Sequence, residues 1–339
     1  MKRLTTIIIL VYATGTTFAT QVTHKQERMT IFERRRFIEK FNEDDLDYAS
    51  AVIWGKKEER AKKNIDMILA QDDWEKRIHG INGLISQHES SDAKNLRMVL
   101  CGYVQDKALE CKSGSKKQKM LVEMLAMHTN DPDDYIANRC IQWLREFDRA
   151  SFNDKAIEIL REKLKNNPSA QLIYLMGKID PEFCIKHTKK WVKGINFNAK
   201  HIGYDRARYA AVKVRARCGD PRYIKLALDT WEYYDKDMGG LNGFGEIEYI
   251  PRFEVVKYLS KKVRSNKVIP GAVDYPTFSY ADEACRLLKK MLVGFPKSKN
   301  DGYYTKEDFP ICLKWLSEQK KYIFRDPAPN LNVAELDKD

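Results

Sequence analysis

The sequence is poor in the residues that interrupt helices, with 17 glycines and 11 prolines among 339 residues. Proteins built from many short strands place these two residues at frequent turns, so an all-β fold is disfavoured. Lysine, glutamate, leucine, alanine and arginine are abundant instead, and these residues favour helices. Hydrophobic residues make up 43% of the chain and aromatic residues 11%, which argues against disorder of the whole protein. We therefore predict an all-α fold.

The sequence lacks the motifs that mark common catalytic sites. It has no G-x-S-x-G, no H-E-x-x-H, no P-loop and no dinucleotide-binding fingerprint after a strand. Its six histidines are scattered, and no two share a predicted helix at a spacing of four residues. We therefore predict no catalytic residues and no cofactor. An enzyme or enzyme subunit on the same scaffold, of lyase or DNA-glycosylase type, is the alternative.

The seven cysteines include no CxxC pair and no Cys/His ligand spacing, which argues against a zinc site. Several lie on apolar helical faces, where a buried thiol acts as a small hydrophobic group. In an exported protein one or two disulfides are the alternative, and Cys101 with Cys111, which flank a predicted loop, are one candidate pair. The cysteines are Cys101, Cys111, Cys140, Cys184, Cys218, Cys285 and Cys312.

The N-terminus has the pattern of a signal peptide. Lys2 and Arg3 precede an apolar run from Leu4 to Tyr12, and the small residue Ala19 precedes a suitable cleavage point. We predict a signal peptide over residues 1–19 and an exported protein, periplasmic or secreted. An uncleaved anchor and a buried first helix are the alternatives. No later stretch reaches 18 uncharged apolar residues, so we expect the mature chain to be soluble.

The chain is basic, with a formal charge of +12 that falls to about +10 once Lys2 and Arg3 are removed with the signal. Many of the basic residues lie in four clusters, at 33–36, 56–63, 112–119 and 261–267. Such clusters are typical of solvated helix faces. The alternative is a basic surface that meets an anionic polymer or a membrane.

A repeat of about 35 residues begins near residue 131. Predicted first helices start near Asp133, Ser169 and Tyr204, at spacings of 36 and 35 residues. Gly219 ends one helix and Pro221 opens the next, as expected at helix boundaries. A period of this size with paired helices is the signature of an α-solenoid. We predict an N-terminal helical region over 20–130, helical repeats over 131–324 and a C-terminal tail over 325–339.

One unit, "DRARYAAVKVRARCGDPRYIKLAL", resembles a HEAT repeat. Asp205 and Arg206 open its first helix, Ala210 and Ala211 lie at the centre, and Gly-Asp-Pro marks the turn. The resemblance is best over 204–232 and extends to 131–194. It implies a right-handed α-solenoid of helical hairpins, and an irregular helical bundle is the alternative.

The tryptophans fall about one to a predicted unit, which is typical of core packing. The alternative is a row of rings along the concave face. In its repeat style and basic charge the chain resembles a HEAT-like family of alkylpurine DNA glycosylases. That family's catalytic Asp and its Trp residues cannot be placed in this sequence. Export also argues against nucleic acid as a partner. The tryptophans are Trp54, Trp74, Trp143, Trp191, Trp231 and Trp315.

The stretch "DKDMGGLNGFGEIE", residues 235–248, matches part of the EF-hand pattern. Asp235, Asp237 and Glu246 could supply carboxylates to calcium, but Gly239 offers no side chain where another ligand is expected. Removing the stretch restores the spacing of about 35 residues. We predict a mobile insertion that carries binding, with calcium as the lesser alternative.

Together these patterns predict a non-catalytic binding scaffold in the cell envelope. The partner is a protein, or else an anionic polymer or membrane surface, held on a curved helical surface by basic and aromatic side chains. Nothing in the sequence indicates an oligomeric state.

Overall fold

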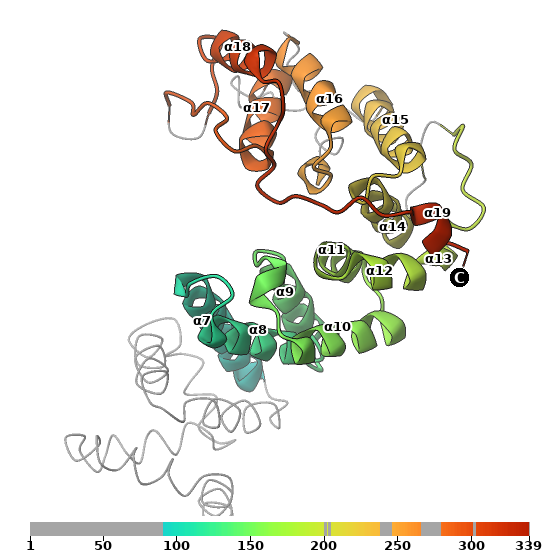
Figure 1. The fold of residues 1–339 in the computed structure, drawn as a ribbon. Helices are drawn as coiled ribbons and strands as arrows, with labels where there is room; N and C mark the ends of the chain where they lie inside the picture. Colours follow the sequence, from blue (N-terminus) through green and yellow to red (C-terminus); the bar gives the residue numbers. More distant parts are fainter. Residues whose placement is uncertain are drawn as a thin grey trace, which may run out of the picture. The chain divides into compact units, whose positions relative to one another are not determined.

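The computed structural model describes residues 91–199, 202, 205–237, 246–265, 279–300 and 303–338. Within these ranges the chain is helical and contains no strand beyond two isolated bridges. The predicted all-α class is therefore confirmed for the described residues (Figure 1). The predicted signal peptide and residues 20–90 lie outside them.

The chain divides into two compact units, Met1–Ile159 and Leu160–Asp339. The described helices of the first unit begin with α7, and α10 crosses the boundary between the units. In this part of the chain no helix is long and apolar enough to cross a lipid bilayer. The elements are α7 (Ser91–Glu110), α8 (Lys116–His128), α9 (Asp134–Leu144), η1 (Arg149–Ser151) and α10 (Asp154–Asn166).

In the first unit, α7 packs on α8 and α9 around an apolar core. The turn before α9 is fixed by Asp133, whose carboxylate accepts hydrogen bonds from the backbone N–H groups of Tyr135 and Ile136. Two residues earlier, Asp131 forms a salt bridge with Arg97 of α7. The turn is therefore held both by its own cap and by a neighbouring helix.

The second unit is built around α14, which contacts α11 and α15. Asp205 caps α14, Gly219 has a φ of +94° at its end, and Pro221 opens α15, as predicted. The helices are α11 (Ala170–Ile179), α12 (Pro181–His187), α13 (Lys189–Val192), α14 (Arg206–Arg217), α15 (Pro221–Asp237), η2 (Ile247–Tyr249), α16 (Phe253–Val263), α17 (Tyr280–Met291), α18 (Phe309–Glu318) and α19 (Val333–Leu336).

Close packing of α11 on α14 depends on Gly177. A Cβ atom at this position would lie 2.4 Å from both the Tyr249 hydroxyl oxygen and a Val214 methyl carbon. Tyr249 in turn donates a hydrogen bond from its hydroxyl to the Tyr174 carbonyl, at 2.9 Å. The absence of a side chain at Gly177 therefore lets α11, α14 and η2 pack closely together at this point.

The stretch expected as a tail packs against the second unit. Phe324 pairs with Leu292 in an antiparallel bridge, and the Arg325 N–H donates to the Met291 carbonyl at 2.8 Å. From there the chain runs past α17 and α16 to α19, which lies beside α12 (Figure 1). We call residues 325–338 the C-terminal segment.

Candidate functional site

The C-terminal segment lies against three arginines, which we call the arginine face: Arg215, Arg217 and Arg252. The first two lie near the end of α14, and Arg252 immediately precedes α16. Arg215 and Arg217 are 0% and 2% exposed, although arginine is rarely buried without partners. Every guanidinium nitrogen of Arg215 has an acceptor, whereas Arg217 has acceptors at its two Nη atoms and its Nε is buried without one.

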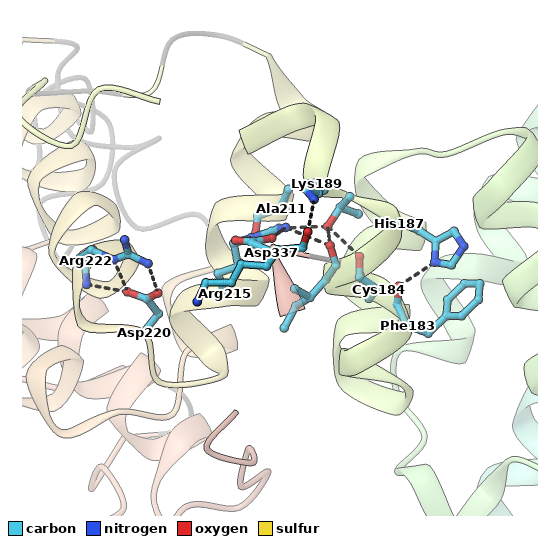
Figure 2. Close-up of polar contacts among 12 residues, drawn as sticks. Phe183, Cys184, His187, Lys189, Ala211, Arg215, Asp220, Arg222 and Asp337 are labelled. Carbon is cyan, nitrogen blue, oxygen red and sulfur yellow. Dashed lines mark hydrogen bonds and ion pairs between the residues drawn. The ribbon is translucent and has the colours of Figure 1, made fainter. Parts of the chain in front are cut away.

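Arg215 holds the carboxylate of Asp337 through two contacts, Nη2 to Oδ1 at 2.6 Å and Nε to Oδ2 at 3.2 Å (Figure 2). Its Nη2 also donates to the Ile185 carbonyl at 2.9 Å. Its Nη1 donates to the Thr188 hydroxyl at 3.0 Å and to the Ala211 carbonyl at 3.2 Å. The guanidinium is thus fully satisfied by α12, α14 and the C-terminal segment together. A two-point contact of this kind fixes the orientation of a carboxylate.

Arg217 contacts a second carboxylate of the segment. Its Nη2 lies 3.0 Å from Asp326 Oδ1, and its Nη1 donates to the Tyr249 carbonyl at 2.8 Å. Lys178 Nζ lies 3.7 Å from the other oxygen of Asp326. Because the Asp326 side chain is 50% exposed, water screens this pair more strongly than the Arg215 pair.

Arg252 binds main-chain carbonyls. Its Nε donates to the Arg217 carbonyl at 2.9 Å, which satisfies a carbonyl at the end of α14. Its two Nη atoms donate to the Pro329 carbonyl at 2.7 Å and to Asn330 Oδ1 at 2.5 Å. Burial lowers the pKa of the Arg252 guanidinium, and these acceptors offset part of the cost of that burial.

Further main-chain contacts hold the segment along its length. The Leu331 N–H donates to the Cys218 carbonyl at 3.0 Å, and Lys189 Nζ donates to the Lys338 carbonyl at 3.3 Å. Val333 is 2% exposed and supplies an apolar anchor. The second unit therefore holds the C-terminal segment by two carboxylates eleven residues apart, by its backbone and by one buried side chain.

A second cluster surrounds Lys213 of α14, which is 1% exposed. Its Nζ lies 4.2, 5.4 and 5.7 Å from the ring centroids of Tyr209, Tyr174 and Trp231. It also lies 3.6 Å from Glu246 Oε2. Burial, followed by the nearby Glu246 charge, raises the pKa of the Tyr174 phenol. The cluster pairs a buried ammonium with aromatic faces and one carboxylate, a stabilising arrangement.

The calcium candidates are only partly described. Asp235 and Asp237 lie in the last turn of α15, but their side chains and residues 238–245 fall outside the described residues. Glu246 has a φ of +60° and its carboxylate faces Lys213. No group of three or more His, Cys, Asp or Glu side chains that could hold a metal occurs among the residues described. Calcium binding there stays a prediction.

The candidate disulfide between Cys101 and Cys111 is wrong. Cys101 lies within α7 and Cys111 directly follows this helix, so the two are ten positions apart along a helical stretch. At 1.5 Å per residue their backbones are roughly 15 Å apart, whereas a disulfide needs less than about 7 Å. All seven thiols are free in the structure.

The described tryptophans do not form one class. Trp231 is fully buried, as core packing predicts, whereas Trp143, Trp191 and Trp315 are partly exposed. Trp54 and Trp74 lie outside the described residues. The four described tryptophans therefore do not form a continuous exposed row on which a ligand could stack.

The arginine face was missed in the sequence. The signal is the run "AAVKVRARC" in α14, where Lys213, Arg215 and Arg217 interrupt residues that otherwise suit a buried helix. Such a pattern predicts buried cations and therefore buried partners. The pattern does not reveal that two of these partners, Asp326 and Asp337, lie in the last fourteen residues.

Comparisons with protein-family models, with curated proteins and with solved structures found no match to this chain.

Proposed function

We propose that the protein is a non-catalytic binding scaffold that holds an acidic, extended segment of a protein partner on the arginine face. The observation that carries the proposal is the two-point contact between Arg215 and Asp337, which are 122 residues apart. The protein's own C-terminal segment serves as an internal example of the ligand. A partner segment of the same chemistry would replace it.

The contacts favour a polypeptide over other anionic partners. Arg252 and Lys189 donate hydrogen bonds to main-chain carbonyls. Phosphate polymers, and polysaccharides that carry only sulfate or carboxylate groups, do not present carbonyls at this spacing. Arg215 meets a planar carboxylate through two of its nitrogens, a geometry suited to Asp or Glu. An anionic polymer would gain charge attraction but not the backbone contacts.

The wider architecture belongs to the same proposal. We propose that the helix pairs form a HEAT-like α-solenoid, which the capped α14–α15 hairpin and its Gly-Asp-Pro turn support. We also propose that the scaffold works in the cell envelope, which the signal-like N-terminus supports. If so, the chain expressed with its full N-terminus in bacteria should yield a mature protein beginning at Thr20. An intact Met1 in mass spectrometry would contradict export with cleavage.

The binding proposal is tested with a fluorescent peptide of residues 326–338 and the full chain. In the wild type the C-terminal segment competes with the peptide. The Asp326→Asn/Asp337→Asn variant weakens this internal competitor, so we expect it to bind the peptide about tenfold more tightly than the wild type does, which corresponds to roughly 1.4 kcal/mol. Fluorescence anisotropy measures both affinities.

Matched controls separate recognition from general charge attraction. A peptide with Asp337→Asn should bind the variant chain more weakly, and adding Arg215→Met to that chain should reduce binding of the wild-type peptide. Polyglutamate and duplex DNA serve as competitors. Equal competition by both would favour the anionic-polymer alternative, and no binding of the peptide to either chain would overturn the proposal.

A further inference from the structure

The C-terminal segment has no core of its own. It runs without a helix over residues 325–332, and α19, which follows, has four residues (Figure 1). A helix this short is not stable by itself in water. It forms here because Val333 is buried, with α19 packed on α12, and because Asp337 is held by Arg215. The segment is therefore ordered by its docking site, which lies in residues 160–324, the body of the second unit.

The sequence of the segment keeps its first part extended. Pro327 and Pro329 each have a φ fixed at about −65° by the ring. Each proline also disfavours the helical conformation in the residue before it, which is Asp326 in one case and Ala328 in the other. Four successive residues are thereby stiffened before they bind, so less conformational entropy is lost on docking. This advantage is the same whichever copy of the chain supplies the segment.

The segment leaves the body at a single bend, formed by Arg325 and Asp326. Both residues are exposed. The residue on the near side is fixed to the body, because the Arg325 N–H donates to the Met291 carbonyl and its Nε donates to the Lys289 carbonyl at 3.1 Å. A different turn at this bend would therefore carry residues 326–338 away from the body while Arg325 stays in place.

We propose that the partner of the arginine face is a second copy of this chain, and that two copies exchange their C-terminal segments to form a dimer. The inference rests on the proposed function, since it names the partner for the same site. In the dimer, Asp337 of each copy meets Arg215 of the other, and Asp326 meets Arg217 and Lys178 in the same way. Exchange of an identical element repeats the contacts of the closed chain, so it is a low-cost route to a dimer.

A second copy supplies every group that the body binds, in the correct order. The carboxylate of Asp337 occupies two nitrogens of Arg215, the Leu331 N–H donates to the Cys218 carbonyl at 3.0 Å, and Val333 is buried. An acidic peptide of unrelated sequence supplies a carboxylate but not the apolar side chain four residues before it. The fit therefore favours the chain's own segment, provided in trans.

The test mixes two full-length variants that each lack one half of the contact. Arg215→Met keeps its segment and has a damaged arginine face, whereas Asp326→Asn/Asp337→Asn keeps its arginine face and has a damaged segment. Neither variant alone offers both halves to a second copy. The mixture does, so we expect the two variants to associate about tenfold more tightly than either associates with itself. Analytical ultracentrifugation measures the association, and native mass spectrometry identifies a complex with one copy of each.

The matched control removes both halves from one chain. Arg215→Met/Asp326→Asn/Asp337→Asn has neither an intact arginine face nor an intact segment, so it should not associate with either of the other variants. If the complementary variants associate no more tightly than the pairs that contain this control, the exchange does not occur and the inference is wrong.

A second measurement uses the wild type and so does not depend on the folding of any variant. Chains grown with ordinary and with heavy nitrogen are mixed in equal amounts, incubated at high concentration and treated with a carbodiimide, which joins a lysine to a carboxylate in contact with it. Lys178 Nζ lies 3.7 Å from Asp326 Oδ2, so this pair is suited to the reaction. We expect linked peptides that combine the two isotopes, in a share that rises with protein concentration. Links that never combine the isotopes would overturn the proposal.

Binding of the isolated peptide separates the failure of this inference from that of the proposed function. If the peptide of residues 326–338 binds but neither complementation nor mixed links are found, the arginine face binds acidic segments and its partner is another protein. If the peptide does not bind either, both proposals are wrong.

Discussion

Two arginine–aspartate pairs in this protein have nearly the same chemistry but different places in the chain. Arg97 donates to both oxygens of Asp131 at 2.9 and 3.1 Å, and the two residues are 34 apart. Arg215 and Asp337 make the same two-point contact across 122 residues. The first pair closes the turn between consecutive helices, whereas the second fastens the end of the chain to a helix.

Exposure separates their roles. The Arg97 and Asp131 side chains are 3% and 1% exposed, so neither is open to a competing ligand. Asp337 is 21% exposed, and a carboxylate from another molecule could take its place beside Arg215. Under the proposed function, the same chemical contact stabilises the turn in the first unit and binds a partner segment in the second.

The largest expected effect is from breaking the pair in the first unit. Arg97→Met leaves the Asp131 carboxylate buried without its main cation, which should lower the free energy of unfolding by about 3–5 kcal/mol. Urea denaturation measures the change. Lys107→Met, whose partner carboxylate Glu110 is 65% exposed, is the matched control and should change stability by less than about 1 kcal/mol. Equal effects of the two substitutions would contradict the assigned role of Arg97.

Arg215→Met should cost less overall but release the C-terminal segment. Asp337 can turn towards water, so we expect a loss of about 1–3 kcal/mol, mostly from the unpaired acceptors left by the guanidinium. Hydrogen exchange followed by mass spectrometry should become faster in residues 325–338 and remain slow in α8 and α9. Uniformly faster exchange in both units would mean that Arg215 supports the whole fold rather than the segment.

The Arg97–Asp131 pair in the first unit should also make the free energy of unfolding depend on pH in the acid range. Burial alone would raise the pKa of Asp131, but hydrogen bonds from His128, the Asp133 N–H and Arg97 outweigh it and lower the pKa below the usual value. A lowered folded-state pKa stabilises the protein above the unfolded pKa of about 4, and this contribution is lost as the pH falls towards the folded pKa. Asp131→Asn should flatten the pH dependence of urea unfolding below about pH 4, and Asp337→Asn is the comparison variant.

Asp326→Asn should give the smallest effect. The carboxylate is half exposed, so its contacts with Arg217 and Lys178 should contribute less than about 1 kcal/mol to stability. Asp326→Asn in the peptide should weaken its binding less than Asp337→Asn does. Added salt should reduce the difference in affinity between the wild-type and the Asp326→Asn peptide. If Asp326→Asn weakened binding more, the exposed pair would be the principal contact.

Local features were predictable from the sequence, and distant contacts were not. Asp133, Ser169 and Asp205 cap helices close to where the repeat places their starts, because capping involves only the next few residues. The contact of Asp337 with Arg215 depends on how the C-terminal segment packs against α14, which spacing alone does not reveal. The pairing of Cys101 with Cys111 is wrong for a local reason: the chain from Cys101 to the end of α7 is helical, and Cys111 directly follows it, which keeps the two thiols far apart.

The close packing around Gly177 limits the order in which amino-acid substitutions can accumulate at this point of the protein. An added methyl group there would meet both Val214 and the Tyr249 hydroxyl at 2.4 Å. A mutational path that places alanine at 177 therefore has to pass first through smaller residues at both 214 and 249, each step leaving a small void. The three positions should thus vary as a set, and a lineage that has made the first two replacements would no longer tolerate their simple reversal.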